Sequence, residues 1–95
     1  MPCQLRVLSG RDSGRIFQLR PGQPFLLGRD MSTQSRLKDP QIAMLHCQVV
    51  VDQEEVILKD RGSSGGTFVQ GQRVSTHSLQ PGDVFRIGDT QIRFE

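Results

Sequence analysis

Short β-rich runs separated by turn-forming residues constrain the fold of this chain more than any other feature. The runs are rich in Val, Ile, Leu, Phe and Thr and stop at Gly, Pro, Asp or Ser, and no segment has helical spacing of apolar residues. They predict strands over residues 3–8, 15–19, 25–27, 45–51, 56–58, 67–69, 72–74, 84–87 and 91–94. Such regular spacing is typical of an all-β sandwich or barrel.

The apolar residues of these runs predict one core. A chain of 95 residues is long enough for one domain and too short for two. We therefore expect residues 1–95 to form a single domain, which could have been excised from a longer protein. The residues expected to be buried are Leu5, Val7, Phe25, Leu27, Val49, Val51, Val56, Leu58, Phe68, Val84, Ile87 and Phe94.

Composition narrows the function classes. No apolar run approaches the roughly 18 residues of a membrane span, and no signal peptide is apparent, so we expect a cytoplasmic domain without membrane contact. Cys3 and Cys47 lack metal or disulfide spacing and are expected to pack as small hydrophobes. The net charge of +2 is too small to predict nucleic-acid binding. Ten of the 12 basic residues are Arg, whose planar fork suits phosphate or carboxylate.

The sequence contains few residues that could form a catalytic site. Residues 62–66 match the G-x-S-x-G pattern of hydrolases, but that motif requires a helix after it, and a predicted strand follows instead. His46 and His77 have neither metal-ligand nor triad spacing, so we expect no metal, no cofactor and no enzymatic activity. A barrel that binds single-stranded nucleic acid would need aromatic residues for stacking. All five Phe lie inside predicted strands, where core packing is the simpler role.

An ordered series of short motifs spans nearly the whole chain. Gly28-Arg29 ends a predicted strand, and His46 opens a later one. Residues 60–74 then read DRGSSGGTFVQGQRV, and residues 79–88 read LQPGDVFRIG. Each piece is weak alone, but in this order they resemble the forkhead-associated (FHA) domain family. The resemblance implies a β-sandwich of two sheets and about eleven strands, whose loops at one end bind phosphothreonine in a partner peptide.

The resemblance also assigns site residues. Arg29 would bind the phosphate, and Ser64 would donate to the phosphate or to the neighbouring peptide. His46 would support the binding loops without touching the ligand, and Gly66-Thr67 would shape the loop and start the next strand. The complete predicted phosphopeptide-binding set is Arg29, Ser64, Ser63, Gly65 and Arg61, supported by His46, Gly28, Gly66 and Thr67.

Three departures from the family pattern leave two hypotheses open. Ala43 stands where the family has Ser, Gly65 where it has the Asn before Gly-Thr, and Gln70 where it has the Asn of Asn-Gly. Losing two hydrogen bonds would weaken binding roughly five- to 150-fold, which Arg36 or Arg61 could offset. The first hypothesis is therefore a monomeric domain with weakened affinity for a phosphorylated protein or peptide. The second is a degenerate FHA domain that binds a partner without phosphate or acts as a scaffold.

Overall fold

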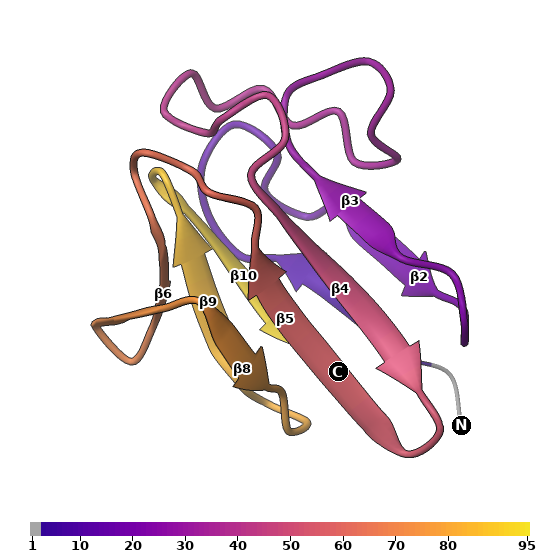
Figure 1. Cartoon of the computed structure of the whole chain (residues 1–95). Coiled ribbons are helices and arrows are strands. Elements are labelled where there is room, and N and C mark those ends of the chain that lie inside the picture. Colours follow the sequence, from indigo (N-terminus) through magenta and orange to yellow (C-terminus); the bar gives the residue numbers. More distant parts are fainter. Residues whose placement is uncertain (1–2) are drawn as a thin grey trace.

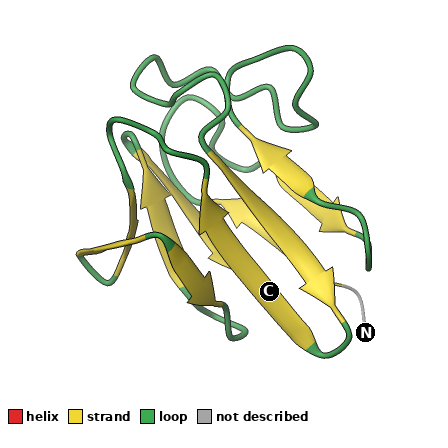
Figure 2. Ribbon diagram, viewed as in Figure 1, coloured by secondary structure: helices red, strands yellow, loops and turns green. Residues whose placement is uncertain are grey.

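The computed structural model describes residues 3–95 and contains ten strands, with no helix in that range. Figure 1 labels the strands, and Figure 2 separates them from the loops. Their bounds are β1(Cys3–Val7), β2(Ile16–Leu19), β3(Phe25–Leu27), β4(Cys47–Asp52), β5(Glu55–Asp60), β6(Thr67–Val69), β7(Gln72–Val74), β8(Thr76–Ser78), β9(Val84–Ile87) and β10(Thr90–Phe94).

The strands form two sheets, which confirms the predicted β-sandwich. Six strands pair in the order β2-β1-β10-β9-β6-β7, and four pair in the order β3-β4-β5-β8. All strand pairs are antiparallel. The two ends of the described chain meet across β1 and β10, where the Gln4 and Glu95 backbones exchange hydrogen bonds of 3.1 and 2.9 Å.

Nine of the ten strands fall on predicted runs, and β8 is the strand that the sequence did not predict. This strand has the sequence Thr-His-Ser and lies at a sheet edge, where it pairs only with β5. Its side chains are exposed or half-buried, so it needs none of the apolar alternation that marks a strand in sequence. The total of ten strands is close to the predicted eleven.

The inner faces of the two sheets form one hydrophobic core. Nine of the twelve residues predicted to be buried belong to it, and three do not: Phe25, Phe68 and Val84 are half-buried. In β6 the inward positions are taken by Thr67 and Val69, so Phe68 faces outward. Val84 is likewise out of phase with the buried Phe85 of β9.

The cysteines are free, as predicted. Cys47 is buried, whereas Cys3 is half-buried. Burial, and secondarily the neighbouring Asp60 carboxylate, raise the pKa of the Cys47 thiol far above its ordinary value, which keeps it inert. No helix within residues 3–95 is long and apolar enough to cross a membrane.

Candidate functional site

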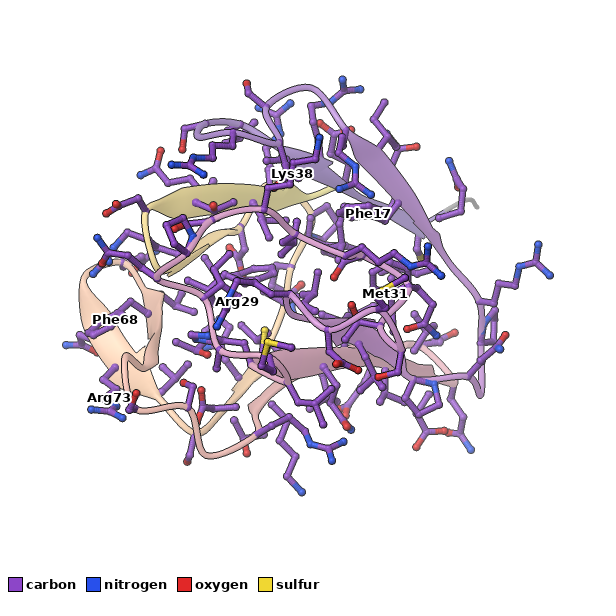
Figure 3. All side chains as sticks on the ribbon, turned by 90° about the horizontal axis from the view of Figure 1, so that it is seen from above. Phe17, Arg29, Met31, Lys38, Phe68 and Arg73 are labelled. Carbon is purple, nitrogen blue, oxygen red and sulfur yellow. The ribbon has the colours of Figure 1, made fainter. Side chains whose placement is uncertain are left out.

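The long loops gather at one end of the sandwich (Figure 1). Loop 28–46 connects β3 to β4, and loop 61–66 connects β5 to β6. A Cβ built on Gly65 would lie 3.8 Å from the Gln41 carbonyl oxygen, so the two loops touch. Figure 3 looks down on this end, with Arg29 near the middle and Met31 beside it. Apart from Thr67, which starts β6, the predicted site residues therefore belong to two contacting loops.

Gly28 holds Arg29 at the rim of the site. A Cβ on Gly28 would lie 2.0 Å from the Met44 carbonyl oxygen, so only glycine allows the two loop segments to approach this closely. The Arg29 N–H donates to the Ala43 carbonyl at 3.2 Å, and its side-chain Nε donates to the Ile42 carbonyl. Its two terminal nitrogens make no hydrogen bond within residues 3–95. The exposed end of the guanidinium is thus oriented and free for an anion.

Loop 28–46 is ordered by buried polar side chains. Alternate residues are buried, namely Thr33, Ser35, Leu37 and Asp39. The Ser35 hydroxyl accepts from the Gly28 N–H at 3.0 Å, and the Thr33 hydroxyl lies 3.2 Å from the Gly28 carbonyl. The loop is therefore held by hydroxyl groups in place of sheet partners, which gives Arg29 a fixed base.

Asp39 ties this loop to the turn between β9 and β10. Its carboxylate accepts from the Asp89 N–H at 2.7 Å, from the Thr90 hydroxyl at 2.9 Å and from the Gln41 N–H at 2.9 Å. Burial raises the pKa of Asp39, but these hydrogen bonds and the charge of Arg11 outweigh it and leave the pKa below its ordinary value.

His46 joins the two loops of the site. Its side chain has no solvent exposure. The Ala43 N–H donates to Nδ1 at 3.0 Å, so Nε2 carries the proton and donates to the Gly66 carbonyl at 2.8 Å. One ring therefore bonds the backbone of loop 28–46 to that of loop 61–66. Both nitrogens are used, which leaves neither for a metal or for proton transfer.

Asp60 organises loop 61–66, and it was not among the predicted site residues. Its Oδ1 accepts from the hydroxyls of Ser63 at 2.6 Å and Thr67 at 2.7 Å. Its Oδ2 accepts from the N–H groups of Gly62 at 2.9 Å and Ser63 at 3.1 Å. Burial raises the pKa of Asp60, but these four hydrogen bonds outweigh it and lower the pKa. An Asp two residues before a Gly-Ser pair is the sequence signal of such a turn.

Ser63 and Ser64 play different parts. The Ser63 hydroxyl is buried, donates to Asp60 and accepts from the Gly66 N–H at 3.1 Å, so it is committed inside the loop. This differs from the predicted ligand contact and makes Ser63 a support of the loop. Ser64 and Gly65 are exposed, and the Ser64 hydroxyl makes no hydrogen bond within residues 3–95. Ser64 is therefore the hydroxyl of this loop that a ligand can reach.

Two further arginines flank the loops. Arg61 is exposed and donates to the Gln48 side chain at 2.9 Å. Arg36 is exposed, has a left-handed backbone with φ of 46°, and donates to the Met31 carbonyl at 3.1 Å. Within residues 3–95, neither Arg29 nor these two forms an ion pair with a carboxylate. This end of the sandwich thus presents free cationic donors, an exposed hydroxyl and exposed loop backbone, which together suit a phosphate group.

Two alternative chemistries suggested by the sequence lack their structural requirements in the described residues. No group of three or more His, Cys, Asp or Glu that could hold a metal occurs between residues 3 and 95. The strand β6 follows the G-x-S-x-G segment directly, so that segment lacks the helix that a hydrolase nucleophile requires.

Comparison with known proteins places this site in a family context. The family model described as the cytoplasmic domain of the inner membrane component of T3SS matches residues 6–95. The FHA domain-containing protein FhaA of Mycobacterium tuberculosis is 36% identical over 80 residues, which cover 84% of this chain and 15% of FhaA. The chain thus spans only a small part of that relative.

Solved structures extend the likeness to the whole chain. One, from a structural and functional analysis of phosphothreonine-dependent FHA domain interactions, has a TM-score of 0.91 and 32% identity, covering 100% of this chain and 96% of that one. Another is the crystal structure of the FhaA FHA domain complexed with the intracellular domain of Rv3910. It has a TM-score of 0.88 and 32% identity, covering 98% of this chain and 99% of that one.

Proposed function

The chain belongs to the family of forkhead-associated (FHA) domains, and we propose on that premise that it binds a phosphothreonine-containing peptide of a partner protein. The observation that carries the proposal is the free terminal end of the Arg29 guanidinium, held by Gly28 and Ile42 at the end of the sandwich where the loops meet. A similar solved domain is described by its phosphothreonine-dependent interactions. The chain acts as an interaction module and not as an enzyme.

Arg29 supplies the charge in this proposal. Its two terminal nitrogens contact phosphate oxygens, a charge-assisted interaction worth about 1.5–3 kcal/mol. The Ser64 hydroxyl and the Gly65 N–H donate to the phosphate or to the peptide beside it. Arg61 lies at the start of the same loop and adds positive charge. Asp60 and His46 touch no ligand and fix the loop backbones on which these donors sit.

The affinity is expected to be modest. Ala43 has no hydroxyl and Gly65 no side-chain amide, so two neutral hydrogen bonds of the family pattern cannot form. At about 0.5–1.5 kcal/mol each, their loss weakens binding roughly five- to 150-fold. The predictions of a monomeric, cytoplasmic domain that needs no cofactor and binds no nucleic acid remain predictions.

Phosphate-independent binding is the second candidate. It is favoured by the same two departures and by the matched family, which is described as a domain of a T3SS membrane component. In that case the loops would contact a partner surface, or the domain would serve as a scaffold, and Arg29 would contribute little to affinity.

Isothermal titration with one peptide sequence in three forms separates the two candidates. Peptides carrying phosphothreonine, phosphoserine or unmodified threonine are titrated into the domain and into Arg29→Ala. We expect binding of the phosphothreonine form alone, with a loss of at least about tenfold in Arg29→Ala. Arg20→Ala is the matched control, since Arg20 is exposed and precedes β3 outside both loops. Equal binding of all three forms, unchanged by Arg29→Ala, would favour the phosphate-independent function.

A further inference from the structure

The outer face of the six-stranded sheet carries a row of four residues on four neighbouring strands. Phe68 of β6 pairs with Arg73 of β7 on one side and with Arg86 of β9 on the other, and Arg86 pairs with Gln91 of β10. Figure 3 shows Phe68 and Arg73 on the flank of the molecule, away from Arg29 at the centre of the loop end. This Arg73–Gln91 row therefore lies away from Arg29 and touches the loops of the candidate phosphopeptide site through Arg73, which contacts loop 61–66.

Both arginines of the row are ordered by contacts within the domain. The Arg86 guanidinium carbon lies 4.5 Å from the centre of the Phe68 ring, and Nη1 donates to the Gly88 carbonyl at 2.9 Å. Arg73 Nη2 donates to the Ser63 carbonyl at 3.1 Å. A guanidinium that is already held in place loses less conformational entropy when it binds a ligand.

Neither arginine has a carboxylate partner among residues 3–95. The neighbouring row differs, because Arg6 and Arg93 on the same face both bond to Glu95. Each guanidinium has five N–H donors, and the contacts above use only one in Arg73 and one in Arg86. The Arg73–Gln91 row thus presents two positive charges with unused donors.

A hollow of about 380 Å³ adjoins the row and gives it an apolar element. Its lining combines apolar residues such as Phe68 and Val84 with the polar side chains of Asp83, Arg86 and Gln91. Phe68 and Val84 face outward and are half-buried, so their apolar surface is partly open to solvent. The hollow can accommodate an apolar side chain, while the two arginines can bind negatively charged groups.

We propose that the Arg73–Gln91 row binds an extended acidic segment of a partner protein, through carboxylates on Arg73 and Arg86 and an apolar side chain in the hollow. Neighbouring strands lie about 4.8 Å apart, so two residues on alternate strands are about 10 Å apart. A peptide in the polyproline II conformation has three residues per turn and rises about 3.1 Å per residue, so acidic residues three positions apart lie about 9 Å apart on the same side. Charge complementarity therefore selects the segment Glu-x-x-Glu.

A single-stranded nucleic acid fits this row less well. It would need an aromatic face on which a base can stack. The guanidinium of Arg86 lies over the ring of Phe68, and the other Phe residues of this sheet, Phe17, Phe85 and Phe94, are buried. The row therefore offers donors for anionic groups but no open platform for bases.

Fluorescence anisotropy with the labelled, unphosphorylated peptide Gly-Glu-Leu-Ala-Glu-Gly tests the proposal. We expect binding at low salt that weakens about three- to tenfold in Arg86→Gln and in Arg73→Gln. Arg86→Lys keeps the charge without the planar fork and should lie between Arg86→Gln and the parent. Arg20→Gln is the matched charge control and should bind like the parent. Arg29→Ala should also leave this binding unchanged, which separates the row from the phosphopeptide site.

Amide chemical shifts locate the contact independently of affinity. Binding of the peptide should change the amide chemical shifts of residues 67–69 and 84–87 and leave those of residues 41–46 unchanged. The proposal is overturned by absence of binding, by equal weakening in Arg86→Gln and Arg20→Gln, or by shifts confined to residues 41–46. Tighter binding of a ten-residue oligothymidylate through the same two arginines would also overturn it, in favour of nucleic acid.

Discussion

Replacement of His46 tests whether one buried ring holds the two binding loops together. His46→Ala removes the acceptor of the Ala43 N–H and the donor to the Gly66 carbonyl. Gly66 is buried, so its unpaired carbonyl alone costs about 1–3 kcal/mol. The space left by the ring adds a cavity cost on the order of 1–2 kcal/mol. We therefore expect the free energy of unfolding to fall by about 2–5 kcal/mol.

Urea denaturation measures this loss. With a slope of about 1.5 kcal/mol per molar urea, the midpoint should fall by roughly 1–3 M. Hydrogen exchange gives a local readout, because the Ala43 N–H loses its acceptor and should exchange faster. The variant should still fold, since the total free energy of unfolding of such a domain is about 5–15 kcal/mol.

His77→Ala is the matched control. The His77 side chain is 33% exposed and lies 3.5 Å from the Asp83 carboxylate, an arrangement typical of a weak surface pair. Its loss should therefore cost less than about 1 kcal/mol. An unchanged midpoint in His46→Ala, or equal losses in the two variants, would refute the assignment of His46 as the link between the loops.

Three further predictions concern the loops and one hairpin. The double variant Ala43→Ser, Gly65→Asn should raise phosphopeptide affinity roughly five- to 150-fold by titration, because each new side chain can add a hydrogen bond. The backbone accepts Asn at position 65, since Gly65 has no left-handed φ and a Cβ there meets only the Gln41 carbonyl at 3.8 Å. No gain in affinity would favour phosphate-independent binding. Gln70→Asn should raise the urea midpoint slightly, because Gln70 has φ of 52° in a two-residue turn with Gly71, and Asn tolerates this conformation better; a lower midpoint would contradict it. The lowered pKa of Asp60 means that its carboxylate stabilises the fold above the unfolded pKa of about 4 and loses this effect as pH falls through the folded pKa. The stability advantage of the parent over Asp60→Asn should accordingly shrink on acidification, and a constant difference would argue against the Asp60 bonds.

The sandwich could be predicted because most strands have a sequence pattern that is recognisable without the structure. The run in β9, for example, combines Val, Phe and Ile with clear turn residues at both ends. The misplaced core residues show where this fails. Phe68 is the largest residue of β6, and its size predicted burial, whereas the alternation with Thr67 and Val69 turns it outward.

The site was predictable only in part, for a related reason. Gly28-Arg29, His46 and Gly66-Thr67 stand at motif positions, so the resemblance could point to them. Residues 33–39 read as a polar stretch without pattern, although every second residue is buried. Polar side chains that satisfy backbone groups leave no hydrophobic signal, so the anchoring of the loop becomes visible only in three dimensions.

The pairing of Gln4 with Glu95 determines how the domain would respond to mechanical force. These residues lie at the start of β1 and just beyond the end of β10, two adjacent antiparallel strands. Tension applied at residues 3 and 95 would pull across the strands, along the direction of their hydrogen bonds. The hydrogen bonds would then break one after another, in an unzipping geometry, and not all together as in shear. The domain should therefore unfold at low force when it is pulled from these two ends.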